Sequence, residues 1–226
     1  MFKKYLRKTI DISPIINTII GEIKIKEEAN MNSRLEKQIK FLLEIDKMKT
    51  IYRQTILIDK SRQENDAEHS WHFATMAVIL YEYVDGSKVD LFRVIKMALV
   101  HDLVEIYAGD TYAYDIVANL GSEEREKKAA NKLFKLLPED QAKEIKQLWE
   151  EFDKKETEDA KYAVAIDTLQ PFLSSYYTEG KMWKINKVTA DKVYTRMKRI
   201  EKGIPELWPF VDNLIKDSIE KGYLIN

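Results

Sequence analysis

Apolar residues recur every three or four positions along most of the chain, and this spacing is typical of amphipathic helices. One stripe begins with Leu35 and Ile39, and others follow at similar spacing up to the C-terminus. Residues 50–65 are rich in polar and charged side chains and predict a connecting loop. Because no segment alternates convincingly between apolar and polar residues, the pattern predicts an all-α fold. We expect helices around residues 31–48, 65–84, 87–108, 122–137, 138–152, 156–177, 189–200 and 207–221.

Residues 1–30 differ from the rest of the chain. They carry an Ile-rich segment and a short polar stretch, and a new amphipathic pattern starts at Met31. Asn32 or Ser33 is suited to cap the helix that follows, because either side chain can accept a backbone amide. Residues 1–30 are either a helical extension or an upstream misassignment of the start codon. We predict a dispensable extension followed by one domain, residues 31–226.

Composition narrows the class of protein. The chain has 226 residues, enough for one sizeable domain, and its 7 Gly and 5 Pro disfavour a turn-rich β fold. Lys and Arg number 37 against 38 Asp and Glu, so no overall positive charge favours nucleic acid as a partner. No run reaches the length of a membrane span, and we expect neither a signal peptide nor a membrane partner. The absence of Cys excludes disulfides and thiol catalysis and is compatible with the cytoplasm, where we expect the protein.

Candidate chemistry concentrates near the middle of the chain, in the stretch from Ala98 to Asp110. Helical spacing places His101 and Asp102 on or beside the apolar face that Ala98 would bury. An imidazole and a carboxylate on such a face need a partner, because uncompensated burial is costly, and a divalent cation suits both. Glu105 follows one helical turn later and faces the same space, and Asp110 follows the turn that Gly109 permits.

Two further residues complete a candidate metal-binding set. His69 and Asp167 each lie on the apolar stripe of a different predicted helix, so three helices together supply two imidazoles and two carboxylates. This mixture suits a divalent ion such as Mn²⁺, Co²⁺, Fe²⁺, Ni²⁺ or Zn²⁺ and does not select one of them. A bound ion of this kind can activate water, and Glu105 or Asp110 could then position the water or protonate a leaving oxygen. His72 lies one turn from His69, and we expect it not to be a ligand.

The ordered set resembles a known signature. His69, then His101–Asp102, then Asp167 resembles the H…HD…D pattern of the HD-domain metal-dependent phosphohydrolases. The neighbouring residues resemble the branch of that superfamily that contains bacterial 5′-deoxynucleotidases and their eukaryotic relatives. The resemblance covers about residues 31–226. The stretches that carry it are Arg62–His72, His101–Asp110 and Ala165–Pro171.

The resemblance implies an all-α HD-domain helical bundle, commonly a homodimer, that holds one divalent metal ion. It implies catalytic roles for Glu105 and Asp110, and in this branch an Arg upstream of the first His contacts the substrate phosphate. Arg53 is the nearest match, and Arg62 is the second candidate for substrate binding. Arg53 is followed by Gln54–Thr55, whereas the branch has an Arg-Trp pair, which leaves the base and sugar preference open. The metal ligands that the resemblance implies are His69, His101, Asp102 and Asp167.

The sequence therefore predicts a metal-dependent phosphohydrolase that acts on a small phosphorylated substrate. A nucleoside or deoxynucleoside 5′-monophosphate is the expected substrate, and the metal could also be Mg²⁺. Two alternatives stay open. One is a phosphodiesterase or a (p)ppGpp-type hydrolase, whose larger substrate would need more basic residues around the pocket. The other is a regulatory protein in which the metal is only structural, although such a site has no need for Glu105 and Asp110.

Overall fold

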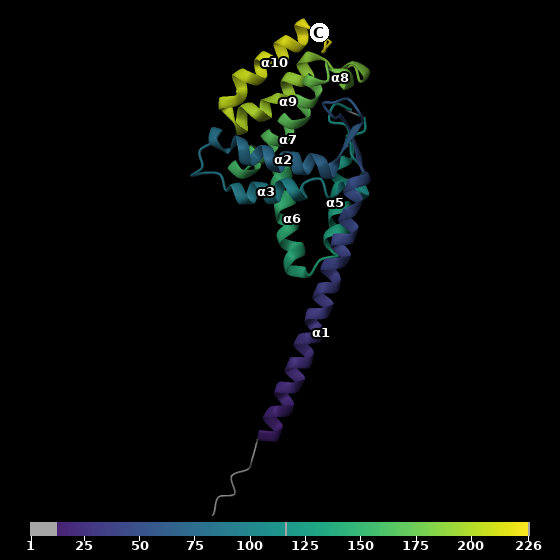
Figure 1. Cartoon of the computed structure of the whole chain (residues 1–226), viewed down its shortest axis with the longest axis vertical. Coiled ribbons are helices and arrows are strands. Elements are labelled where there is room, and N and C mark those ends of the chain that lie inside the picture. The colour runs from purple at the N-terminus through teal and green to yellow at the C-terminus, as the bar shows by residue number, and fades with distance from the viewer. Residues whose placement is uncertain (1–12, 116, 226) are drawn as a thin grey trace, which may run out of the picture.

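Helices make up most of the computed structural model, which describes residues 13–115 and 117–225, as the apolar spacing predicts (Figure 1). Residues 1–12, within the predicted extension, lie outside the described part of the chain. The α-helices are α1 Ser13–Ile45, α2 Asp66–Ile79, α3 Leu91–Val100, α4 Glu105–Ala108, α5 Ser122–Phe134, α6 Glu139–Lys154, α7 Glu158–Tyr177, α8 Lys181–Ile185, α9 Ala190–Gly203 and α10 Trp208–Glu220. Strands β1 and β2 span Tyr52–Ile56 and Gln63–Asn65, and short 3₁₀ helices span Asp46–Thr50, Leu80–Tyr83 and Pro205–Leu207.

Helix α7 forms the centre of the core, and α2, α3, α6 and α9 pack around it (Figure 1). Its sequence is apolar on most sides, so residues such as Ala163, Ile166 and Leu169 are buried in different directions. Small residues let the neighbouring backbones approach closely. A Cβ added at Gly203, the last residue of α9, would lie 2.2 Å from the carbonyl oxygen of Lys161. Only glycine fits this contact, and α9 therefore lies tightly along α7.

A two-stranded sheet occupies the segment expected to be a loop. Strands β1 and β2 are antiparallel, with Tyr52 opposite Asn65 and Ile56 opposite Gln63. The two strands are too short, and too rich in polar residues, to show the alternation that identifies a strand from sequence. The hairpin places Arg53 on the inner side, against the helices, where its side chain is only 13% exposed.

Helix α1 runs without a break through residues 30–33, so the predicted helix start with a cap at Asn32 or Ser33 is wrong. It extends well away from the other helices (Figure 1). Its C-terminal half is attached to α6, because Arg34 forms two hydrogen bonds of 2.8 Å with the carboxylate of Asp140. Helix-forming residues on both sides of Met31 allow the helix to continue, since a good capping residue does not force a helix to begin.

The division at residue 30 stays a prediction. A chain that starts at Met31 keeps Arg34 and its contact with Asp140, and we expect its melting temperature and metal content to match those of the full chain. Thermal unfolding and elemental analysis of both chains test this. A large drop in melting temperature would show that residues 1–30 stabilise the domain.

Helix α3, which was expected to include His101, is shorter than predicted. It ends at Val100, and residues 101–104 form tighter turns, in which the amide of Glu105 donates to the carbonyl of Asp102 at 2.9 Å. The carbonyl of Ala98 would accept the amide of Asp102 in a continuing helix, and it accepts a hydrogen bond from Nδ1 of His101 at 3.0 Å. This side-chain bond to the backbone accompanies the end of α3. In the described residues, none of the helices combines the length and the apolar character that a membrane span requires.

Candidate metal centre

Helix α2 places His69 at the centre of the fold. The helix begins with a capping box, as its sequence predicts: Asn65 accepts the amide of Glu68, and the Glu68 carboxylate accepts the amide of Asn65. One turn later His69 is fully buried, and its Nε2 lies 3.0 Å from Oδ1 of Asp167 on α7. Two residues 98 positions apart in the chain are thus in direct contact.

His101 and Asp102 approach the same place from the end of α3. Nε2 of His101 lies 3.0 Å from Oδ2 of Asp102 and 3.7 Å from Oδ1 of Asp167. Oδ2 of Asp102 also lies 3.8 Å from Nε2 of His69. The structure therefore brings together the four side chains predicted as metal ligands.

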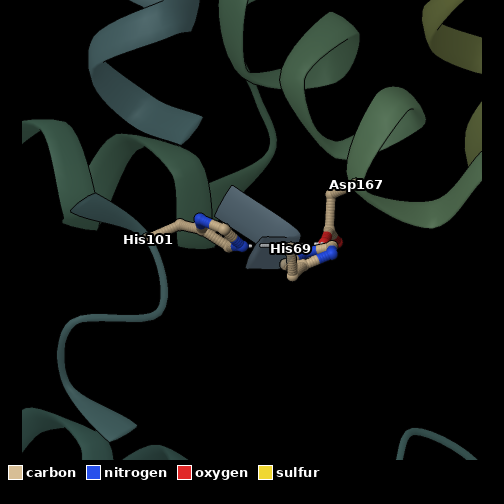
Figure 2. Close-up of side chains that lie close together, drawn as sticks. All are labelled: His69, His101 and Asp167. Carbon is tan, nitrogen blue, oxygen red and sulfur yellow. Dashed lines mark hydrogen bonds and ion pairs between the residues drawn. The ribbon is translucent and has the colours of Figure 1, made fainter. Parts of the chain in front are cut away.

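The donor atoms of this group fit a divalent cation. One atom each from His69, His101 and Asp167 lies within 4.8 Å of the others, and the three side chains converge from separate elements (Figure 2). Nε2 of His101 is buried without a hydrogen-bond partner in the described residues. A buried imidazole nitrogen that faces carboxylates is a preorganised ligand position, since leaving it unpaired costs free energy. Two nitrogen and two carboxylate donors match the predicted set, with Asp102 as the fourth member.

A buried glutamine orients the first ligand. Oε1 of Gln170 lies 3.0 Å from Nδ1 of His69. The amide oxygen can only accept, so Nδ1 of His69 carries the proton and Nε2 is left with its lone pair toward Asp167. The amide nitrogen of Gln170 donates to Oε1 of Glu64 at 2.7 Å and lies 3.2 Å from Nδ1 of His72. His72 thus contacts the support of a candidate ligand and is not one of the converging groups.

Replacing Gln170 with methionine is expected to weaken metal binding about 10–100-fold, the usual effect of losing a partner that orients a ligand. Methionine has a similar length and cannot accept the proton on Nδ1 of His69. The measurement is metal affinity, by competition with a chelator of known affinity. The matched control is Gln141→Met, which removes a hydrogen bond to Gln38 between α6 and α1 and should leave the affinity unchanged. Unchanged affinity in Gln170→Met would show that His69 needs no such support.

Arg53 lies among carboxylates beside the candidate ligands. Its Nη1 is 2.6 Å from Oδ2 of Asp102 and 3.3 Å from Oδ1 of Asp66, and its Nε is 3.9 Å from Oε2 of Glu64. Burial raises the pKa of Asp66 and of Glu64 to about 7 in each case, and Arg53 opposes that shift. The sequence prediction missed both carboxylates, although they flank the Asn65 cap.

Glu105 and Asp110 lie at the same site as the candidate ligands. Oε2 of Glu105 is buried without a hydrogen-bond partner in the described part of the chain. Burial raises the pKa of Glu105 well above its ordinary value, and the charges of Asp102 and Asp66 raise it further. Burial also raises the pKa of Asp110, and the nearby Arg53 guanidinium opposes the shift. Both carboxyl groups are thus favoured in the protonated form relative to a carboxyl group in water.

The candidate site opens into a cavity of about 200 Å³. Arg62 does not reach it, because its guanidinium forms hydrogen bonds of 2.8 and 2.6 Å with the carboxylate of Glu68 near the surface. The structure thus places Arg62 outside the lining of this cavity, and its role in substrate binding stays a prediction. Residues from β1, α7, α9 and the loop after α4 surround the cavity. Its polar and aromatic lining includes Arg53, His101, Asp102, Glu105, Asp110, Tyr112, Tyr114, Asp167, Trp183 and Arg196.

The fold and the converging histidines and aspartates match a known class. The family model described as "HD domain" matches residues 45–208, and the chain belongs to this family. Mouse 5′-deoxynucleotidase HDDC2 is 28% identical over 138 residues, which are 61% of this chain and 67% of the relative. The Xenopus laevis protein of the same name is 31% identical over 125 residues, 55% of this chain and 58% of the relative. The match thus spans about two thirds or less of these relatives.

Two solved structures share this fold. A structure described as a predicted metal-dependent phosphohydrolase from Magnetospirillum magnetotacticum is 51% identical, with a TM-score of 0.82. It covers 86% of this chain and 97% of its own. A conserved hypothetical protein from Pyrococcus furiosus is 22% identical, with a TM-score of 0.54, covering 80% of this chain and 99% of its own, and shares the fold.

Proposed function

We propose that this protein is a metal-dependent phosphohydrolase that removes phosphate from nucleoside or deoxynucleoside 5′-monophosphates. The observation that carries the proposal is the convergence of His69, His101 and Asp167, with Asp102 beside them, at a cavity that Glu105 also lines. A purely structural metal site has no need for an extra buried carboxyl group at an open cavity. The relatives named 5′-deoxynucleotidase support the choice of substrate.

The candidate ligands would hold one divalent ion. When bound, such an ion supplies Lewis-acid chemistry toward a phosphate ester. The mixed nitrogen and oxygen donors suit Mn²⁺, Co²⁺, Fe²⁺, Ni²⁺ or Zn²⁺, and Mg²⁺ belongs to the same proposal because carboxylates are among its ligands.

The other residues of the cavity have separate proposed roles. Arg53 supplies positive charge beside Asp102, where a substrate phosphate would lie, and such preorganised charge stabilises a developing negative charge. Glu105 and Asp110 are the groups placed to hold or transfer a proton, either at the attacking water or at the leaving oxygen of the nucleoside. Neither is required to complete the set of four ligands.

A phosphate-release screen over nucleotides and sugar phosphates, repeated with each of the candidate metals, tests the proposal. We expect deoxynucleoside 5′-monophosphates to be among the best substrates. Release from phosphodiesters or (p)ppGpp-type nucleotides instead would move the protein to the alternative hydrolase class. No release with any metal would favour a regulatory protein with a structural metal.

The homodimer that the family resemblance implies stays a prediction, which light scattering of the purified protein tests.

A further inference from the structure

A second hollow, of about 290 Å³, adjoins the cavity of the candidate metal centre. Ala113, Tyr114 and Arg196 line both spaces, so the two are neighbours that share a wall. The other residues that line the second hollow come from α9, and one of them, Arg199, also lines a small space beside His101, Asp102 and Asp167. These residues of α9 are Asp191, Lys192, Thr195 and Arg199.

The wall of this hollow is strongly cationic. Lys192, Arg196 and Arg199 follow one another at intervals of four and three residues, which places them on one face of α9. Asp191 is the only carboxylate among the residues that line the hollow. Val193, Met197 and Ile200 anchor the helix in the core beside this row, so the row has a fixed position.

The three cations have no direct ion-pair partner among the described residues, and Arg199 feels only the more distant charge of Asp167. Among the described residues, none of Lys192, Arg196 and Arg199 forms an ion pair, whereas Arg53 is held by Asp102 and Asp66. Burial lowers the pKa of Arg199 and the neighbouring Arg196 lowers it further, while the charge of Asp167 opposes the shift. Like charges held side by side and partly buried repel each other, and an anion between them would relieve that repulsion. Arginine pairs are well suited to bind phosphate, because each guanidinium can donate two parallel hydrogen bonds.

Two tyrosine rings lie between such an anion and the candidate metal centre. Tyr114 lies between the two spaces, and the guanidinium carbon of Arg196 is 6.0 Å from the centre of its ring. Tyr112 packs edge-on against Tyr114, with their ring centres 5.5 Å apart. Aromatic rings are suited to contact a sugar or a base. A row of three cations is suited to contact a negatively charged group on the same ligand.

We propose that the hollow beside α9 binds a second phosphate of the substrate, so that the preferred substrate class is a nucleoside bisphosphate with phosphates on two positions of the sugar. One phosphate would lie at the metal centre and the other against Lys192, Arg196 and Arg199. This inference rests on the proposed function, since it assumes a phosphomonoester at the metal centre. It depends on cations of α9, and one of them, Lys192, lines neither space beside the candidate metal ligands, so the two proposals can be tested separately.

The test compares deoxyadenosine 5′-monophosphate with deoxyadenosine 3′,5′-bisphosphate on the metal-loaded full chain. KM is measured where phosphate is released, and Kd is measured by calorimetry where it is not. We expect the KM or Kd of the bisphosphate to be lower than that of the monophosphate by about tenfold or more, because hydrogen bonds between charged groups are stronger than neutral ones. Arg196→Gln should remove most of this advantage; because Arg196 also lines the cavity of the candidate metal centre, its kcat for the monophosphate is not used as a control.

Two further variants separate binding from folding. Lys192 lines only the second hollow, so Lys192→Gln should weaken binding of the bisphosphate alone. Lys198 is an exposed residue of the same helix, and Lys198→Gln should change the binding of neither ligand. Equal values for the two ligands in the unmodified protein, or a ratio unchanged in both Arg196→Gln and Lys192→Gln, would overturn the inference. Hydrolysis of the monophosphate with no such advantage would leave the proposed function intact. If the unmodified protein bound the bisphosphate more tightly, the variants lost this preference and neither ligand were hydrolysed, only the proposed function would be contradicted.

Discussion

Replacing His101 with alanine is expected to remove the bound metal and with it the phosphatase activity. Nε2 of His101 lies 3.0 Å from Oδ2 of Asp102 and 3.7 Å from Oδ1 of Asp167, so its loss leaves two carboxylates without one of their two nitrogen partners. Elemental analysis of protein purified without chelator gives the metal content. We expect about one equivalent in the unmodified protein, on the basis of one four-ligand set, and almost none in the variant.

The controls separate metal loss from unfolding. Asp102→Asn keeps the shape of the side chain and removes its charge, so it should lose metal with a smaller effect on the melting temperature. His72→Ala is the matched histidine variant, because His72 contacts Gln170 and is not among the converging donors, and it should keep its metal. If His101→Ala and Asp102→Asn both retained a full equivalent of metal, the ion would have to be bound elsewhere.

Glu105→Gln is expected to keep the fold and the metal and to lose about 10²–10⁴-fold in kcat on deoxynucleoside 5′-monophosphates, the usual contribution of a positioned acid or base. The carboxyl group lines the cavity, and its Oε2 has no partner in the described residues. Glutamine has the same shape but cannot transfer the proton. Phosphate release and metal content measured on the same preparation check both halves of the prediction.

Glu123→Gln is the matched control for this variant. Its carboxylate is on the exposed face of α5 beside Lys127, where an ion pair contributes little, and we expect no change in kcat or metal content. Full activity of Glu105→Gln with metal bound would exclude Glu105 from proton transfer. Asp110 would then be the remaining carboxyl group at the cavity for that role.

Local patterning determined much of what was predicted about this protein. The helical spacing of apolar residues predicted the all-α fold class, and the comparisons confirm both that class and the resemblance to HD-domain proteins. The capping box at Asn65 and Glu68 was also readable, because both partners lie within four residues and a helix start depends on local hydrogen bonds. The roles of the individual site residues stay predictions until the variants are measured.

Patterning was misleading where two local signals competed. A capping residue near Met31 suggested a helix start, and the helix runs straight through it. The hairpin of β1 and β2 was missed because strands of five and three residues are stabilised by pairing with each other and by packing on the helices. Neither stabilisation is visible in a short segment considered alone.

Only the tertiary structure decided which groups surround the candidate ligands. Gln170 and Glu64 are 106 residues apart, and their hydrogen bond exists only because the hairpin of β1 and β2 packs against α7. The cationic row of α9 has an ordinary surface composition, and its position beside Tyr114 depends on how α9 lies along α7. Helix periodicity specifies which face a residue occupies, whereas what that face meets depends on long-range packing, on which local spacing carries no information.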